Sequence, residues 1–279
     1  MNRVLSNRPL ARDIHELVVE APGIAAVALP GHFVVAMADA KGERIPLTIA
    51  DHDPVRGTLT LVVMTVGTST RKVVSVPEGG NLFALAGPLG IPSEIRGFGT
   101  VVLIAGGVGA APVYPIARAL KEAGNRVIVI QGARHKDLLF WSDRLSSASS
   151  RHILVTDDGS TGAKGLVTAP LQELLETRSE GPIACVWAIG PSPMMRACAE
   201  ITRPFSVKTL VSLNTLMVDG TGMCGGCRVD VGGKVRFTCV DGPEFDGHEV
   251  DWGLFFSRQK VYHAQEQCSL ERYVKEIIP

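Results

Sequence analysis

The middle of the chain constrains the fold most, because strand-like and helix-like segments alternate there. The run "VVLIAGG" that begins at Val101 is continuously apolar, as expected of a strand that is buried on both faces. A helix is expected from Pro112 to Ala123. Further strands are expected at "RVIVIQG", "HILVTDDG", "IACVWAIG" and "VKTLVSL", and further helices at "TAPLQELLE" and "SPMMRACAEI". This alternation predicts an α/β domain with a parallel sheet over residues 99–213.

Residues 1–98 show the pattern of a small antiparallel β-barrel. "HELVVEA" and "HFVVAMA" alternate apolar with polar or small residues, and "GTLTLVVMTV" is typical of a strand with a buried face. Turn clusters such as "DHDPVRG" and "VPEGG" separate these strands. One helix is expected in "TSTRKVVSV", with Thr68 or Ser69 as its N-cap and Pro77 closing it.

Residues 214–279 form a third, smaller part that carries most of the cysteines. The segment "CRVDVGGKVRFTC" predicts a hairpin with Gly-Gly as its turn, and a polar helix is expected at the C-terminus. The predicted organisation is therefore a barrel at 1–98, a sheet domain at 99–213 and a cysteine-bearing segment at 214–279.

Charge and composition limit the classes of partner. Lys and Arg together number 28, as do Asp and Glu, so neither nucleic acid nor an anionic membrane is an expected partner. The longest uncharged apolar run, from Thr100 to Ala117, contains glycines and two prolines and is shorter than the ~20 residues of a membrane helix. No signal-peptide core is present, and the cysteine usage fits a reducing compartment. We therefore expect a cytoplasmic protein.

The segment "AGGVGAAP", between a buried strand and a helix, is a candidate phosphate-binding turn. Gly106, Gly107 and Gly109 let the backbone approach a pyrophosphate, and Pro112 suits the first turn of a helix. The segment departs from the dinucleotide fingerprint, because Pro112 replaces the third Gly or Ala and the next strand ends in Gln131 instead of an acid. On this motif alone, a tight strand–helix turn without a ligand stays an alternative.

Asp219, Cys224, Cys227 and Cys239 have the spacing of a metal site. The pattern D-x4-C-x2-C-x11-C resembles the plant-type [2Fe–2S] run, with an aspartate in place of the first cysteine. A zinc ribbon would need a second C-x-x-C or paired histidines, a Rieske centre would need two histidines, and "CGGC" does not open a helix after a strand as in thioredoxin. A [2Fe–2S] cluster with Asp219 as fourth ligand is favoured over rivals that use Cys268 or His248.

Six motifs together resemble the ferredoxin–NADP reductase superfamily in their order and spacing. They are "RIPLTI", "VGTSTRKV", "GPLG", "GGVGAAP", "GAR" and "IGPSPMM". The resemblance implies a β-barrel that holds FAD, followed by an α/β domain that holds a nicotinamide nucleotide. Two subunit families with a C-terminal [2Fe–2S] segment are most similar. They are the small subunit of NADH-dependent reduced ferredoxin:NADP oxidoreductase, also known as the sulfide dehydrogenase flavin subunit, and the electron-transfer subunit of dihydroorotate dehydrogenase.

The resemblance also implies roles for individual residues. Arg44 would bind the FAD pyrophosphate, and Thr48 would hydrogen-bond near the flavin N5 atom, which makes it the candidate catalytic residue. The other FAD-binding candidates are Pro46, Leu47, Gly67, Thr68, Ser69 and Gly87. The NAD(H)-binding candidates are Gly106, Gly107, Gly109, Pro112, Arg134, Asp157, Asp158, Gly190, Pro191 and Met194.

Several of these residues leave alternatives open. Asp157 and Asp158 fit ribose hydroxyls, but they fit a solvated acidic turn equally well. Arg134 does not decide between NAD and NADP. Leu47 and Ile189 stand where the family often has an aromatic residue and a cysteine, so the groups near the nicotinamide differ here.

The implied function is that of a flavo-iron–sulfur electron-transfer subunit. NADH would reduce FAD by hydride, and single electrons would leave through the cluster to a larger flavin and iron–sulfur oxidoreductase subunit, with ferredoxin reached indirectly. Asp219 favours the NADH-dependent ferredoxin:NADP transhydrogenase, with or without electron bifurcation. The dihydroorotate dehydrogenase subunit, which resembles a four-cysteine site, is the alternative. A non-catalytic module that binds a nucleotide and a metal and senses redox state is a further alternative.

Overall fold

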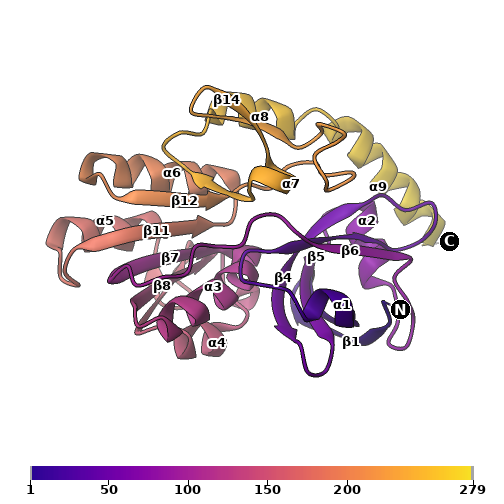
Figure 1. The fold of residues 1–279 in the computed structure, drawn as a ribbon, viewed down its shortest axis with the longest axis horizontal. Helices are drawn as coiled ribbons and strands as arrows, with labels where there is room; N and C mark the ends of the chain where they lie inside the picture. Colours follow the sequence, from indigo (N-terminus) through magenta and orange to yellow (C-terminus); the bar gives the residue numbers. More distant parts are fainter. Residues whose placement is uncertain (1, 278–279) are drawn as a thin grey trace.

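The computed structural model describes residues 2–277, which form a barrel, an adjoining sheet domain and a segment that spans both (Figure 1). The barrel lies beside the sheet domain, and the C-terminal segment lies across the top of the two. Within residues 2–277, no helix is both long and apolar enough to cross a membrane.

The N-terminal part is a six-stranded antiparallel sheet with the strand order β1-β2-β5-β4-β3-β6. An isolated bridge between Arg3 and Asn81, and a hydrogen bond from the Val4 amide to the Gly80 oxygen (2.8 Å), join its first strand to the segment before its last. The interior is filled by aliphatic side chains such as Leu17, Leu61 and Val63. The strands are β1 (Val4–Ala11), β2 (Ile14–Glu20), β3 (Phe33–Met37), β4 (Ile45–Asp53), β5 (Thr58–Met64) and β6 (Ala84–Leu89), and the helices are α1 (Pro22–Ala25) and α2 (Thr68–Val74). The predicted barrel is confirmed.

The start of α2 differs from the sequence-based expectation. Gly67 is the N-cap residue, in place of Thr68 or Ser69, and its amide donates to the Thr70 hydroxyl at 3.0 Å. The reason is that Thr70 supplies the capping oxygen from within the first turn. The hydroxyls of Thr68 and Ser69 are therefore available for other partners.

The second part is built on the predicted parallel sheet. Its strands are β7 (Thr100–Gly106), β8 (Arg126–Ala133), β9 (Arg151–Thr156), β10 (Ala163–Lys164), β11 (Ile183–Ile189) and β12 (Lys208–Ser212). The helices are α3 (Ala110–Glu122), α4 (Ser142–Ser147), α5 (Thr168–Thr177) and α6 (Ser192–Thr202). Helix α3 begins two residues before the expected Pro112, because a proline is tolerated within the first turn.

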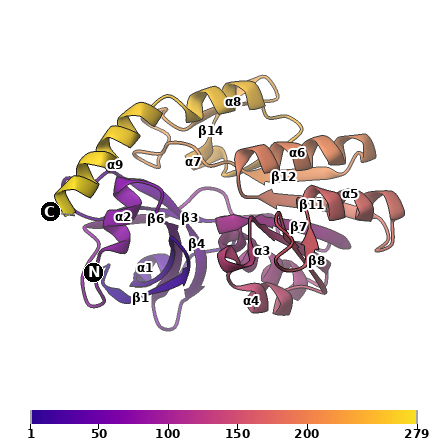
Figure 2. The same cartoon turned by 180° about the vertical axis from the view of Figure 1, so that it is seen from behind.

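The continuous apolar run of β7 is explained by helices on both faces of the sheet (Figure 2). Val101 and Leu103 pack with α3 and α4, whereas Val102 and Ile104 pack with α5 and α6. All four side chains are fully buried. Successive residues of a strand point to opposite faces, so a strand between two helical layers must be apolar throughout.

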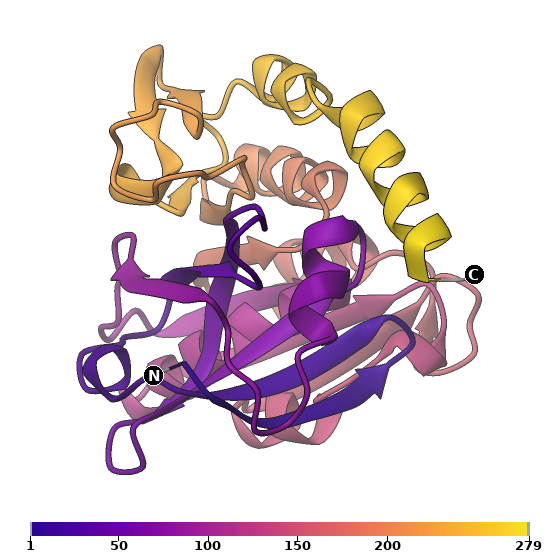
Figure 3. The ribbon, with the colours of Figure 1, turned by 90° about the vertical axis from the view of Figure 1, so that its right-hand side faces the viewer.

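The third part adds an edge strand to this sheet. The predicted hairpin is present as β13 (Arg228–Val231) and β14 (Lys234–Phe237), with Gly232 and Gly233 at the turn. Strand β15 (Glu244–Asp246) pairs antiparallel with β12, which extends the sheet across the boundary expected at residue 213. The helices are α7 (Thr238–Asp241), α8 (Trp252–Gln259) and α9 (His263–Ile277). Helix α9 runs from this segment to the side of α2 on the barrel (Figure 3).

Candidate functional site

The nucleotide-binding candidates gather where the strand order of the sheet reverses. The order β10-β9-β8-β7-β11-β12-β15 shows that the chain adds strands to one side of β7 and then returns to the other side at β11. In open α/β sheets, ligands bind beyond the carboxyl ends of the two strands at such a reversal. Gly106 ends β7, and Gly190 directly follows β11. The sequence alone did not reveal this order.

Close packing at this edge explains the glycines. A Cβ atom on Gly106 would collide with the Met194 thioether, and one on Gly109 would collide with the Ile189 carbonyl oxygen. Gly190 has φ +159°, and a Cβ there would lie 2.8 Å from the Gly106 oxygen. Five of the candidates therefore meet at one place: Gly106, Gly109, Gly190, Pro191 and Met194. Gly107 has φ +54° with open space around it, and Pro112 lies in the first turn of α3.

Arg134, Asp157 and Asp158 follow the ends of β8 and β9 at the same edge of the sheet, and all three are exposed. The Asp158 carboxylate accepts hydrogen bonds from the Ser160 hydroxyl and amide, at 2.7 and 2.9 Å, and these bonds lower its pKa. The Asp158 side chain thus stabilises its own turn, which was the alternative to a ribose contact. Asp157 uses its amide in the same turn, donating to the Ala133 oxygen at 3.1 Å.

The flavin candidates lie on and around β4. Strand register pairs Thr48 with Phe33 and Pro46 with Val35, and directly opposed residues point to the same face. Leu47 points the other way into the barrel, where it is 8% exposed. Any contact that Leu47 makes with a flavin would therefore use its backbone. Gly87 of β6 packs against β3, because a Cβ there would lie 2.8 Å from a Val34 methyl.

The phosphate candidates lie at the start of α2 and before β4. Arg44 is exposed, and its neighbour Glu43 accepts a hydrogen bond from the Ser69 hydroxyl at 2.8 Å. This bond brings the Arg44 segment next to the Gly67–Ser69 turn. The Thr68 hydroxyl lies 3.0 Å from that of Ser269 on α9. An exposed guanidinium beside a turn with amide and hydroxyl donors is a donor set that fits a pyrophosphate.

Two of the predicted cluster ligands pack directly on the barrel. The thiols of Cys227 and Cys239 are buried and lie 3.2 Å apart. They belong to an apolar cluster with Phe33, Val35 and Met217, and Leu89 packs against it. The loop approaches closely here, since a Cβ on Gly220 would lie 2.7 Å from a Leu89 methyl.

Asp219 and Cys224 complete the predicted set on an exposed loop. The Asp219 carboxylate accepts hydrogen bonds from the amides of Thr221 (2.9 Å) and Cys224 (2.6 Å), and these bonds lower its pKa. Within residues 2–277, no three Cys, His, Asp or Glu side chains converge closely enough to hold a metal ion. The predicted ligands approach one another in pairs, Cys227 with Cys239 and Asp219 with Cys224.

The donor set nevertheless fits an iron–sulfur cluster. Asp219, Cys224 and Cys227 lie on one loop, and Cys239 lies in α7, directly after the hairpin. The Gly226 amide donates to the Cys224 sulfur at 3.4 Å. Amide donors of this kind stabilise reduced clusters. Burial, with Cys227 alongside, raises the pKa of the Cys239 thiol to about 12. A bound cation favours the thiolate, so metal binding at this pair would release protons.

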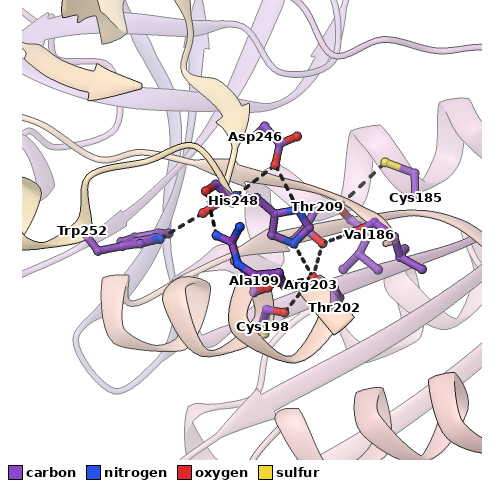
Figure 4. A network of polar contacts seen from close by, with 12 residues as sticks. Cys185, Val186, Cys198, Ala199, Thr202, Arg203, Thr209, Asp246, His248 and Trp252 are labelled. Atoms are coloured by element: carbon purple, nitrogen blue, oxygen red, sulfur yellow. Dashed lines mark hydrogen bonds and ion pairs between the residues drawn. The ribbon is translucent and has the colours of Figure 1, made fainter. Parts of the chain in front are cut away.

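The two rival fourth ligands lie outside the cysteine loop. His248 lies in a polar network beside the sheet, with its Nε2 atom 2.9 Å from the Thr202 hydroxyl and its Nδ1 atom 3.5 Å from Asp246 (Figure 4). Arg203 also donates to the His248 backbone oxygen at 2.7 Å. Cys268 lines a pocket between α2 and α9. The contacts of His248 favour Asp219 over this rival, and Cys268 lies on α9, beside α2 of the barrel.

Residues that join the three parts were not found from the sequence. The Trp141 indole donates to Glu16 of the barrel at 3.1 Å, and Arg118 of α3 donates to Asp51 of β4 at 2.8 Å. Glu244 of β15 accepts hydrogen bonds from Ser93 (2.6 Å) and from the Trp187 indole (3.2 Å). Charged residues scattered along a sequence carry no local signal of such partners, because the pairs are far apart in the chain.

Comparison with known proteins identifies the two C-terminal parts. Residues 103–200 match the family model of the oxidoreductase NAD-binding domain, and residues 214–251 match that of the iron–sulfur cluster binding domain of dihydroorotate dehydrogenase B. A protein of Thermotoga maritima, named as a homolog of the dihydroorotate dehydrogenase B (NAD+) electron transfer subunit, is 46% identical over 99% of this chain and 96% of its own length. The chain belongs to this family of electron-transfer subunits.

Other relatives agree with this assignment. The electron transfer subunit of dihydroorotate dehydrogenase B from Caldanaerobacter subterraneus is 31% identical over 89% of this chain and 96% of its own length. A chain in the structure of an NADH-dependent reduced ferredoxin–NADP oxidoreductase, reported for flavin-based electron bifurcation, is 44% identical, with a TM-score of 0.92 and 98% of both chains covered. Phthalate dioxygenase reductase, at 17% identity and a TM-score of 0.56 over 82% of this chain and 85% of its own, shares the fold.

These matches confirm several expectations drawn from the sequence. The resemblance to the ferredoxin–NADP reductase superfamily is confirmed, and the protein is an electron-transfer subunit of the oxidoreductase class. The expected cofactors, FAD, an iron–sulfur cluster and NAD(H), are supported as well. The individual ligands and contacts stay predictions.

Proposed function

We propose that this subunit transfers electrons from NADH, by way of FAD and a [2Fe–2S] cluster, to a larger partner subunit. One observation carries the proposal. Thr48 and Pro46, the flavin candidates of β4, point to the same face of the barrel as Phe33 and Val35, against which Cys227 and Cys239 pack. A flavin on this face and a cluster in the loop would be separated only by one layer of side chains, which includes Phe33 and Val35.

Residues of the barrel and of the sheet domain would bind the flavin and the nucleotide and fix their relative position. Arg44 and the donors of Gly67, Thr68 and Ser69 would bind the flavin pyrophosphate. Thr48 would donate a hydrogen bond near N5, and Pro46 would lie against the ring. Gly106, Gly109 and Gly190 would let the nicotinamide nucleotide approach the ends of β7 and β11. The contacts of Arg118 with Asp51 and of Trp141 with Glu16 would fix the barrel relative to the sheet.

The cluster would be held by Asp219, Cys224, Cys227 and Cys239. A carboxylate is a harder ligand than a thiolate, and iron accepts both. A nicotinamide moves two electrons at once, and an iron–sulfur centre moves one. When bound, the three cofactors would therefore allow the two electrons of a hydride to leave one at a time. Burial of the Cys227 and Cys239 thiols would exclude water from the inner side of this site.

The partner that fits best is the larger flavin and iron–sulfur subunit of an NADH-dependent ferredoxin:NADP oxidoreductase, with ferredoxin reached through that subunit. The similarity in structure over 98% of both chains supports this choice, and so does the aspartate at position 219. A second candidate is a dihydroorotate dehydrogenase. It is supported by the match of residues 214–251 to the cluster domain of that enzyme.

The proposal is tested by the visible and EPR spectra of the purified protein under anaerobic conditions. We expect flavin and iron–sulfur bands that bleach on addition of NADH, faster than with NADPH at equal concentration. A colourless protein that binds zinc would contradict the proposal and would favour the redox-sensing module. Faster bleaching with NADPH would overturn the choice of nucleotide and shift attention to Arg134 as a phosphate ligand.

A further inference from the structure

A pocket of about 410 Å³ lies between α2 of the barrel and the C-terminal helix α9, which run side by side in Figures 1 and 3. Its volume falls within the ~300–1,000 Å³ of small-molecule sites. Two residues of α2 and five of α9 line it, so the pocket exists only because the last helix of the chain returns to the first domain. Neither family model covers α9, since the second match ends at residue 251.

The lining residues of this α2/α9 pocket suit a nucleotide. Lys72 and Arg272 bring two cations to it, and Lys72 is partly neutralised by Asp39 at 3.0 Å. Tyr273, which is half-buried, offers an aromatic face for a base. Gln265 carries an amide donor and acceptor side by side, the pattern that recognises an adenine edge. One pocket thus has side chains that suit the phosphate, the face of the base and the edge of the base of a nucleotide.

The pocket is continuous with the predicted pyrophosphate site. Thr68 lines the pocket and is also a flavin candidate, and its hydroxyl bonds that of Ser269 on α9 at 3.0 Å. The adjacent Ser69 bonds Glu43, the neighbour of Arg44, at 2.8 Å. A ligand whose pyrophosphate lies at Arg44 and Thr68 would therefore have the pocket next to its phosphates.

We propose that α9 completes the flavin site and that the α2/α9 pocket takes the adenylate half of FAD. This inference rests on the proposed function, which supplies the flavin. The alternative source of the same chemistry is a free adenine nucleotide. The shared residue Thr68 favours FAD, because one ligand would span both parts of the site.

A consequence is that flavin binding would also restrain the cluster segment. Helix α8 directly precedes α9, and its Arg258 donates to the Gly226 oxygen in the cysteine loop at 3.1 Å. A ligand that holds α9 against α2 would thus also restrain α8 and, through Arg258, the cysteine loop at Gly226.

The test compares FAD with FMN, which lacks the adenylate half, by isothermal titration of the full-length chain after the flavin is stripped. We expect Arg272→Ala and Tyr273→Ala each to weaken FAD binding about tenfold. FMN binding should change by less than about twofold in both variants, because FMN does not reach the pocket. The matched controls are Lys275→Ala and Tyr262→Ala, which remove a cation and an aromatic ring that do not line the pocket.

Three results would overturn the proposal. The first is FAD affinity that stays within about twofold of the wild type in both pocket variants. The second is an equal loss of FAD and FMN affinity, which would mean general disruption of the fold. The third is binding of ADP to the FAD-loaded protein that is lost in the Arg272 and Tyr273 variants, because the pocket would then take a free nucleotide. Failure of the proposed function is distinguishable, because the wild-type chain would then bind neither flavin.

Discussion

The nucleotide edge of the sheet and the cysteine loop of residues 219–227 differ in what holds their backbones in place. At the edge, Gly106, Gly109 and Gly190 fit between neighbouring atoms with no room for a side chain. Residues 101–106 of β7 and 185–189 of β11, which lead to this edge, are buried. In the loop, Met223 is 88% exposed, and the turn is held by the two amide hydrogen bonds that Asp219 accepts.

This difference affects whether each site is already formed before its ligand, a nucleotide or a metal, binds. The edge is organised by the packing of the fold, so it exists before a nucleotide arrives. The loop packs on the barrel at Gly220 and Cys227, but Met223 and Cys224 are exposed. We therefore expect its final arrangement to depend on the metal, as in sites where metal binding is coupled to folding. Three predictions test this contrast, in order of decreasing effect.

The first prediction concerns the packed edge. Gly109→Ala should lower the free energy of unfolding by more than about 3 kcal/mol, because the added methyl collides with the Ile189 backbone and cannot be relieved by a side-chain movement. The matched control is Gly107→Ala, where the space is open and only the positive φ opposes the change, at a cost of about 1 kcal/mol. Denaturant unfolding followed by circular dichroism measures both. Equal losses in the two variants would show that the edge is not held by packing.

The second prediction concerns the loop. Loss of an outer-shell partner weakens metal binding ~10–100-fold. Asp219→Ala should weaken iron binding by at least this factor, because it removes the proposed direct ligand and the side chain that accepts the two hydrogen bonds of the loop. Asp219→Cys should keep the cluster and shift its reduction potential, since thiolate is softer than carboxylate. Iron content, EPR and protein-film voltammetry are the measurements.

The controls for the loop are Cys268→Ser and His248→Ala, which should leave the EPR signal and the potential unchanged. FAD binding should survive in Asp219→Ala, because the flavin candidates of the barrel lie in residues 44–87 and the proposed adenylate pocket is lined by residues of α2 and α9. Unchanged signals in both Asp219 variants, with a change in either control, would identify the wrong residue as ligand.

The third prediction concerns Glu244, which joins the cluster segment to the sheet. Burial raises the pKa of its carboxyl above the ordinary value, and the hydrogen bonds from Ser93 and Trp187 offset only part of this effect. The folded protein therefore keeps a proton that the unfolded chain releases. Stability from this group is fully present below the unfolded pKa of ~4.3 and falls as pH rises through the folded pKa, by at most ~1.4 kcal/mol per pH unit.

Glu244→Gln should flatten this slope, because glutamine does not titrate. Its carbonyl oxygen can still accept from the Trp187 indole, and its amide can donate to the Ser93 hydroxyl. The free energy of unfolding measured between acid and neutral pH gives the comparison. Glu249→Gln, an exposed change in the same segment, is the control and should leave the slope as it is in the wild type. A wild-type slope that persists in Glu244→Gln would show that another group is responsible.

The local elements and the chemistry of the sites could be predicted from the sequence. The apolar run at Val101 required burial on both faces, and Gly232 and Gly233 required a turn between β13 and β14. The spacing of Cys224, Cys227 and Cys239 predicted an iron–sulfur site, which the family match supports. Such features are readable because periodicity and spacing act between residues that are close in the chain.

Only the tertiary structure decided how these elements meet. Nothing local in Thr48 or Phe33 shows that they share a face with Cys227 and Cys239, because that depends on the strand register and on the path of a loop about 190 residues later. The reversal between β7 and β11, the inward side chain of Leu47 and the edge strand β15 likewise follow from pairings of distant segments. Helix α9 was readable as a helix, but its place beside α2 was not, because it depends on the packing of the entire chain between them.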